Sequence, residues 1–269
     1  MSILVVQALY EGIIMGADRN ITSTSVTKTA DGRTIYIVKG QSQRPKVLRW
    51  PNNKALIGYV GVASMGGFPT DEWLYSFIGR NMDFHSFEEL ARALGQEVQA
   101  QRIIDEGQEK AEPLIIHLAG FDKKHGMPVP VIWFIRNSYR LDPIEGYVDI
   151  RKEYLVTEEL WKKQYIGDSS PETIREYLRG RAEAYNPHWF HQGFDLGVFN
   201  TLDAFLRASF RLLIEGHTRH SFPNTLAEWS HHLSMAILTY GAYFQSFYGP
   251  SEQYVGGGVD IVSIPWPNQ

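Results

Sequence analysis

The chain has no cysteine among its 269 residues, and this absence excludes several kinds of chemistry at once. Without a thiol there is no cysteine nucleophile, no thiolate zinc site, no iron–sulfur cluster and no disulfide framework. A chain of this length buries roughly three quarters of the surface that its extended form exposes, so it can fold without a disulfide or a structural metal ion. If the protein is an enzyme that acts through a nucleophile, we expect a hydroxyl.

The sequence also lacks a strong charge, a long apolar run and a targeting segment. Its 26 Lys and Arg residues nearly balance 30 Asp and Glu residues, which gives a net charge of −4. The chain therefore has no excess of positive charge with which to bind the phosphates of a nucleic acid. No apolar run approaches the roughly 20 residues of a membrane helix, and the first residues lack the basic and apolar regions of a signal peptide. We therefore expect a cytoplasmic protein whose partners include neither nucleic acid nor a membrane.

The pattern of apolar and turn residues predicts strands and helices in separate groups. Short apolar runs predict the strands, and Ser86 followed by Glu89 is a capping box that predicts the start of a helix. We expect strands at 2–9, 13–18, 34–38, 46–50, 55–60, 114–121, 129–136 and 259–264. We expect helices at 70–80, 86–104, 196–214 and 226–247, and a loop in the Ser- and Thr-rich stretch at 22–29.

This order of elements predicts an α+β fold. Strands and helices do not alternate regularly, which argues against a doubly wound parallel sheet. The strands need apolar cover on both faces, and two stacked sheets with helices on each outer side provide it. No repeat, low-complexity linker or sharp change of composition marks a domain boundary.

Four segments, in order along nearly the whole chain, resemble segments of the proteasome β-subunit family. SILVVQALYEGIIMGAD at 2–18 resembles the start of a mature subunit, where a hydroxyl residue begins an apolar strand and an aspartate ends the returning one. KVLRWPNNKALIGYVG at 46–61 is similar to the segment that carries the family's lysine, most closely in the bacterial ATP-dependent peptidases. LIIHLAGFD at 114–122 and YVGGGVDIVSI at 254–264 resemble later strands of these N-terminal nucleophile (Ntn) hydrolases.

The resemblance implies the four-layer α-β-β-α sandwich of the Ntn hydrolases, with two stacked antiparallel sheets flanked by helices. It implies one domain over 1–269, with insertions relative to the family near 29–41 and 147–185. The chain departs from the family pattern in four places: Ser2 replaces the usual Thr, Phe190-His191-Gln192-Gly193 replaces Gly-Ser-Gly, Glu252 replaces Asp and Val255 replaces Ser.

The resemblance also implies three catalytic residues, Ser2, Asp18 and Lys46. A hydroxyl is a weak nucleophile near neutral pH and needs an adjacent base. The α-amino group of a chain has an ordinary pKa of about 7.7–8, so an N-terminal Ser carries nucleophile and base on one residue. Ser2 becomes N-terminal once Met1 is removed, which we expect because serine is small. Lys46 would be a fixed cation beside the Ser2 hydroxyl, and Asp18 would hold Lys46 by an ion pair.

Further site positions are implied in the same way. The backbone N–H of Gly61, and secondarily that of Gly58, would donate to the oxyanion of a tetrahedral intermediate. Glu252 and Arg19 would support the site. We expect no cofactor and no metal ion, and we interpret the pair His231-His232 as surface or core residues.

The leading hypothesis is a proteasome-type peptidase or amidohydrolase. Its substrate would be a peptide or protein and its subunits would form a homo-oligomeric ring, while an ATPase partner is not specified by the sequence. A catalytically inactive, ring-forming structural subunit is an alternative that the departures at Glu252 and Val255 favour. A non-proteolytic amide hydrolase or transferase on the same fold is another, because the two insertions would reshape the pocket.

Overall fold

The computed structural model describes residues 2–28, 34–106, 114–124, 127–139, 142–143, 149–154, 171–183, 188–193, 202, 204–209, 211–212, 215, 223–248 and 257–267. They form a mixed α/β protein whose sheets are antiparallel, as the sequence predicts. No helix among these residues is long and apolar enough to cross a membrane.

The first sheet contains the N-terminal hairpin. Its strands are paired in the order β14 (His188–Gly193), β1 (Ile3–Ala8), β2 (Gly12–Asp18) and β15 (Val259–Pro265). The hairpin register pairs Leu4 with Ala17, so the start of β1 lies beside the end of β2. The short runs of Val, Ile and Leu that predict these strands are buried along their whole length in β1 and β2.

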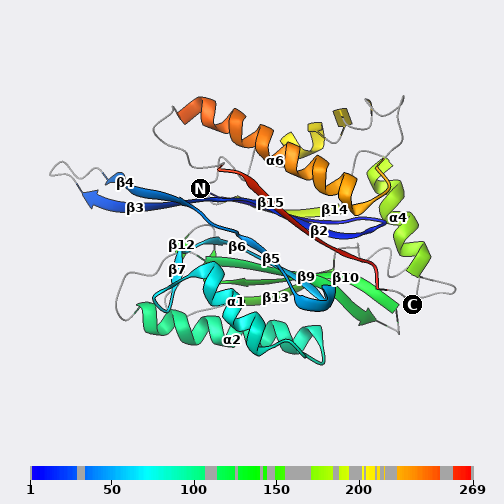
Figure 1. Cartoon of the computed structure of the whole chain (residues 1–269), viewed down its shortest axis with the longest axis horizontal. Helices are drawn as coiled ribbons and strands as arrows, with labels where there is room; N and C mark the ends of the chain where they lie inside the picture. Colours follow the sequence, from blue (N-terminus) through cyan, green and yellow to red (C-terminus); the bar gives the residue numbers. More distant parts are fainter. Residues whose placement is uncertain are drawn as a thin grey trace.

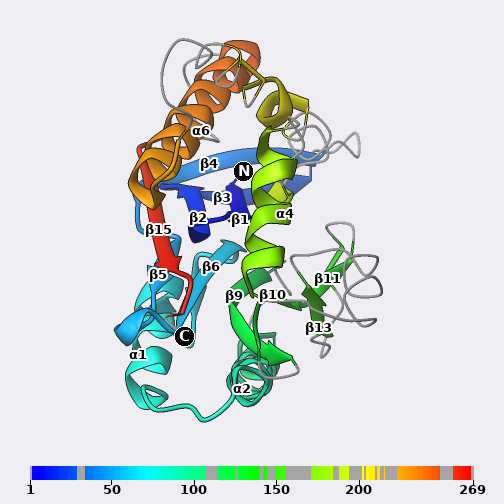
Figure 2. The ribbon, with the colours of Figure 1, turned by 90° about the vertical axis from the view of Figure 1, so that its right-hand side faces the viewer.

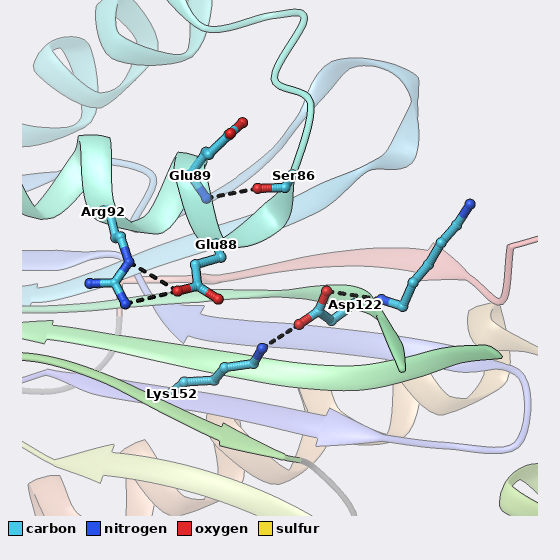
Figure 3. Close-up of polar contacts among 7 residues, drawn as sticks. Ser86, Glu88, Glu89, Arg92, Asp122 and Lys152 are labelled. Carbon is cyan, nitrogen blue, oxygen red and sulfur yellow. Dashed lines mark hydrogen bonds and ion pairs between the residues drawn. The ribbon is translucent and has the colours of Figure 1, made fainter. Parts of the chain in front are cut away.

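The second sheet is built from the middle of the chain. Its strands are paired in the order β13 (Asp149–Tyr154), β10 (Met127–Arg136), β9 (Leu114–Lys124), β6 (Ala55–Gly61) and β5 (Val47–Arg49). A turn of 3-10 helix, η1 (Pro51–Asn53), connects β5 and β6. An ion pair between Asp122 and Lys152 ties β9 to β13 across the strand between them (Figure 3).

A long two-stranded ribbon replaces the loop expected at 22–29, so that prediction is wrong. Strand β3 (Asn20–Lys28) pairs with β4 (Thr34–Gln43), and in Figure 1 the ribbon extends beyond the two sheets. The prediction counted the hydroxyl groups of this stretch as a loop signal, but Thr and Val are β-branched and favour strands. Residues 34–41 of the insertion expected near 29–41 fall in β4, whereas 29–33 lie outside the described residues. Residues 147–148, 155–170 and 184–185 of the other insertion also lie outside them.

Two small pairs of strands complete the strands among the described residues. One pairs β7 (Ser64–Met65) with β8 (Phe68–Pro69), and the other pairs β11 (Ser138–Tyr139) with β12 (Asp142–Pro143). The first hairpin follows β6 directly and leads into the first helix.

The described helices are α1 (Thr70–Arg80), α2 (Phe87–Glu106), α4 (Pro171–Glu183) and α6 (Leu226–Tyr248). The capping box is confirmed, because the Ser86 hydroxyl accepts a 3.1 Å hydrogen bond from the backbone N–H of Glu89 (Figure 3). Glu88 and Arg92 form an ion pair one turn apart on the same helix. Of the helix expected at 196–214, residues 204–209 are helical and much of the remainder lies outside the described residues.

The core lies in three apolar clusters, separated by the two sheets. Side chains of a strand alternate between its faces, so Ile3 and Val5 pack under α6 while Leu4 and Val6 face the second sheet. A third cluster lies between the second sheet and helices α1 and α2. Figure 1 shows α6 outside one sheet and α1 and α2 outside the other, and Figure 2 shows α4 lying along one side of both.

The two sheets approach each other closely at Gly58. A Cβ atom added there would lie 2.7 Å from Leu4 Cδ1 and 2.7 Å from Met15 Sδ, both on the first sheet. A side chain at this point of β6 would require the side chains of Leu4 and Met15 to shift.

We predict that Gly58→Val lowers the free energy of unfolding by about 1–3 kcal/mol, because the added atoms overpack the space between the sheets. Gly79→Ala on α1 is the matched control, since a Cβ there meets nothing within 4 Å. This control is expected to raise the free energy of unfolding by about 0.5–1 kcal/mol, because alanine favours a helix over glycine. Urea unfolding followed by circular dichroism measures both, and a Gly58→Val variant as stable as the parent would contradict the close approach.

Candidate functional site

Ser2 lies at the start of β1, next to the last residue of β2. The hairpin register brings the two strand ends together, and the backbone N–H of Ile3 donates a 2.8 Å hydrogen bond to Asp18 Oδ1. Ser2 is 9 % exposed and Asp18 is fully buried. The carboxylate of Asp18 is therefore fixed beside the start of β1, directly after Ser2.

Lys46 approaches this pair from the second sheet, directly before β5. Its ammonium nitrogen, Nζ, donates to Ser2 Oγ at 2.9 Å and lies 3.1 Å from Asp18 Oδ1. The same nitrogen donates to the backbone carbonyl of Asn20. The structure thus brings together the three residues that the sequence analysis selected, although Ser2 and Lys46 are 44 positions apart.

The surroundings of Lys46 match an ammonium ion. An ammonium has three N–H donors and accepts nothing, and three oxygen acceptors surround Nζ here. Ser2 Oγ receives one of these N–H groups, so the proton of the serine hydroxyl is free to point toward another base. The arrangement places a positive charge within hydrogen-bonding distance of a hydroxyl oxygen.

Burial works against this charge. The side chain of Lys46 is 2 % exposed, and loss of hydration lowers the pKa of Lys46 below its ordinary value of 10.5, while the charge of Asp18 and its hydrogen bond oppose the shift. Desolvation of a buried ion pair can exceed the Coulombic gain. The buried pair is therefore not by itself evidence of a gain in stability.

The carbonyl of Asn20 is the contact that sequence analysis missed. Backbone acceptors carry no residue-type signal, so no motif could identify this one. Its position is a consequence of β3 beginning two residues after Asp18, which carries the chain past the lysine nitrogen.

The other predicted positions have structural roles of their own or lie outside the described residues. Gly61 ends β6 with a φ of 109°, a conformation that favours glycine whether or not its N–H binds an oxyanion. Gly58 lies where the two sheets pack closely together. The guanidinium of Arg19 forms a 2.8 Å ion pair with Asp260 on β15. Glu252 lies outside the described residues.

A cavity of about 570 Å³ lies elsewhere in the molecule. Its lining comes from η1, the segment that leads into α2, the end of β9, and the end of β15 with the residues after it, including Phe84, Phe121 and Trp266. No predicted site residue within the described part of the chain lines it. Within the same part of the chain, no group of three His, Asp or Glu side chains is placed to hold a metal ion.

We predict that the contribution of Lys46 to the free energy of unfolding increases as the pH rises. Between the lowered pKa of the folded state and 10.5, the unfolded chain binds more protons at this residue than the folded chain, so alkali favours folding. The difference in unfolding free energy between the parent and Lys46→Met should therefore grow from neutral pH toward 10.5.

Asp18→Asn provides the second arm of this experiment. It removes the carboxylate that opposes the shift, so the pH range of rising stability should widen. At neutral pH each single variant is expected to lose about 3–5 kcal/mol, because it leaves a buried charge without its partner. A difference between the parent and Lys46→Met that stays constant with pH would show that burial does not perturb this lysine.

Comparison with known proteins finds similarity in solved structures alone. No protein-family model matches it, and no curated protein sequence matches it either. Among solved structures, Anbu (ancestral beta-subunit) from Yersinia bercovieri is 14 % identical with a TM-score of 0.48, covering 98 % of this chain and 82 % of that one. The Anbu (Gly-1) mutant from Hyphomicrobium sp. strain MC1 is 12 % identical with a TM-score of 0.47 and the same coverage.

These findings correct the resemblance drawn from the sequence. The predicted likeness to proteasome β-subunits, closest to bacterial peptidase subunits, is wrong, because no family supports it and these similar structures are Anbu proteins. The motifs that carried it are short apolar strands and glycine turns. Buried strands and tight turns require such residues in many proteins, so these motifs do not distinguish one family from another.

Proposed function

We propose that this protein is an N-terminal nucleophile hydrolase that cleaves amide bonds, with Ser2 as the nucleophile. The observation that carries the proposal is the position of Lys46 Nζ, which lies 2.9 Å from Ser2 Oγ and is held by the buried carboxylate of Asp18. Perturbed, buried titratable groups next to a hydroxyl are typical of catalytic sites. We include in the proposal the four-layer α-β-β-α sandwich that the sequence predicts.

The general base in this proposal is the α-amino group of Ser2 after Met1 is removed. Its ordinary pKa of about 7.7–8 leaves roughly 10–20 % of it unprotonated at about pH 7. Lys46 already donates to Ser2 Oγ and so orients the hydroxyl proton away from itself. The positive charge of Lys46 also disfavours protonation of the nearby amine and stabilises the forming alkoxide.

The reaction proceeds through an acyl ester. The hydroxyl proton of Ser2 passes to the α-amine as Oγ bonds to the amide carbon, and the carbonyl oxygen becomes an oxyanion that the N–H of Gly61 stabilises. The resulting α-ammonium gives its proton to the amide nitrogen as the C–N bond breaks. A water molecule then attacks the ester, with the α-amine as base, and releases a carboxylic acid and the free hydroxyl.

The substrate class in this proposal is a peptide or protein, and the chemistry uses no cofactor. A homo-oligomeric ring stays a prediction from the sequence. It finds support in Met235 and Leu238, which lie on one face of α6 and are 49 % and 41 % exposed, because exposed apolar patches mark interaction surfaces.

We predict that a β-lactone forms one covalent adduct with the protein, on Ser2. A β-lactone acylates a reactive hydroxyl, and peptide mapping by mass spectrometry locates the ester. Ser2→Ala is expected to abolish the adduct and Ser2→Thr to retain it, because threonine supplies the same hydroxyl. Ser64→Ala is the matched control, since Ser64 is an exposed serine outside the site and its loss should change nothing.

A peptide epoxyketone tests the base separately, because its adduct needs both the hydroxyl and a free α-amine. Insertion of a lysine between Met1 and Ser2 should block removal of Met1 and prevent both the epoxyketone adduct and peptide hydrolysis. Labelling that is absent from Ser2 in the parent protein, or unchanged in Ser2→Ala, would reject the catalytic proposal in favour of a structural role.

A further inference from the structure

The segment that leads to Lys46 is tied to the first turn of α1 by Arg44. The Nε atom of Arg44 donates a 2.7 Å hydrogen bond to Asp71 Oδ1, and its terminal nitrogen forms an ion pair with Glu72. The side chain of Asp71 is 5 % exposed, whereas that of Glu72 is 53 % exposed. The Asp71 contact is therefore the protected one, and the Glu72 contact lies at the surface.

Both ends of this contact are restrained. The carboxylates lie in the first turn of α1, where the helix dipole favours negative charge. The planar guanidinium of Arg44 engages two acceptors at once, which fixes its orientation better than a single ammonium contact would. The backbone N–H of Arg44 also donates to the carbonyl of Arg19 at 3.1 Å.

These contacts determine where the backbone of Lys46 lies. Arg44 is two residues before Lys46, and the carbonyl of Lys46 accepts a 2.9 Å hydrogen bond from the N–H of Tyr59 on the neighbouring strand β6. A lysine side chain has a flexible four-carbon stem, so the position of its backbone limits where Nζ can stay. Arg44 on one side and Tyr59 on the other thus hold the lysine in line with Ser2.

The same turn of α1 also holds the chain just beyond Gly61. The hydroxyl of Thr70 donates to the carbonyl of Val62 at 2.8 Å, and the N–H of Thr70 donates to the carbonyl of Ala63 at 3.1 Å. Thr70 is fully buried. One helical turn therefore contacts both the segment that carries Lys46 and the segment that follows Gly61.

We propose that the first turn of α1 is a positioning element of the Ser2 site. Asp71 holds Arg44 and so sets the position of Lys46 beside Ser2, while Thr70 holds the chain just beyond Gly61. This inference rests on the proposed function. Asp71 and Arg44 are positioning residues, since they act on the reacting atoms through Lys46.

The test compares the acylation of Ser2 by a β-lactone in the parent, Asp71→Asn and Arg44→Ala. A misplacement of about 1 Å can cost on the order of 100-fold in rate, so the maximal acylation rate should fall about 10- to 100-fold. The β-lactone concentration at half-maximal rate should stay within about twofold, because neither residue contacts the reagent. Arg44→Lys should recover part of the rate by restoring the charge.

Asp122→Asn is the matched control. It breaks the partly buried ion pair with Lys152 (Figure 3), which joins β9 to β13, whereas Lys46 precedes β5 at the opposite edge of the same sheet. Its acylation rate should equal that of the parent even if it unfolds at a lower temperature. If Asp122→Asn and Asp71→Asn lose the same fraction of the acylation rate, the loss is caused by general destabilisation, and the inference is overturned.

A crystal structure of Arg44→Ala separates this inference from the proposed function. If the parent is not acylated at Ser2, the proposed function fails, but the position of Lys46 can still be measured. We expect Lys46 Nζ to move out of hydrogen-bonding distance of Ser2 Oγ, from the 2.9 Å that it has with Arg44 in place. An unchanged distance in the variant would overturn the positioning role whatever the activity.

Discussion

The buried ion pair between Lys46 and Asp18 is the constraint on which the rest of the site depends. The two side chains are 2 % and 0 % exposed, so polar contacts within the protein must replace the water that each charge loses. The ammonium of Lys46 donates to the carbonyl of Asn20, and the carboxylate of Asp18 accepts from the backbone N–H of Ile3. Those contacts need the register of the β1–β2 hairpin and the start of β3. The hydroxyl of Ser2 lies where these requirements meet, as the third acceptor of the lysine.

The two stacked sheets make this arrangement stiff enough to be useful. Ser2 and Asp18 belong to the first sheet and Lys46 to the edge of the second, so the ion pair crosses between them. Gly58 lets the sheets approach closely behind the pair, and α1 fixes the segments that carry Lys46 and follow Gly61. A catalytic group must be held within a fraction of an ångström to be effective, and rigid strands achieve this better than loops do.

The sequence predicts those parts of the site that side-chain type and strand period determine. The apolar runs place a serine before one strand, an aspartate at the end of its partner and a lysine before another, but it was the resemblance to a known family that implied catalytic roles for Ser2, Asp18 and Lys46. The carbonyl of Asn20 and the contact between Arg44 and Asp71 could not be predicted, because a backbone acceptor and a long-range pair leave no local pattern. The ribbon of β3 and β4 was mistaken for a loop since its hydroxyl residues favour turns as well as strands. The family likeness failed for a related reason, because short apolar motifs reflect burial more than descent.

The most direct test of the central claim is the N-terminus of the protein as its own host makes it. Intact-mass measurement with N-terminal sequencing shows whether the chain starts at Met1 or Ser2. The account predicts that Ser2 is the first residue, with a free α-amino group beside the hydroxyl that Lys46 contacts. Complete retention of Met1 would turn that amine into an amide without basicity, and it would contradict the proposal that Ser2 is an N-terminal nucleophile.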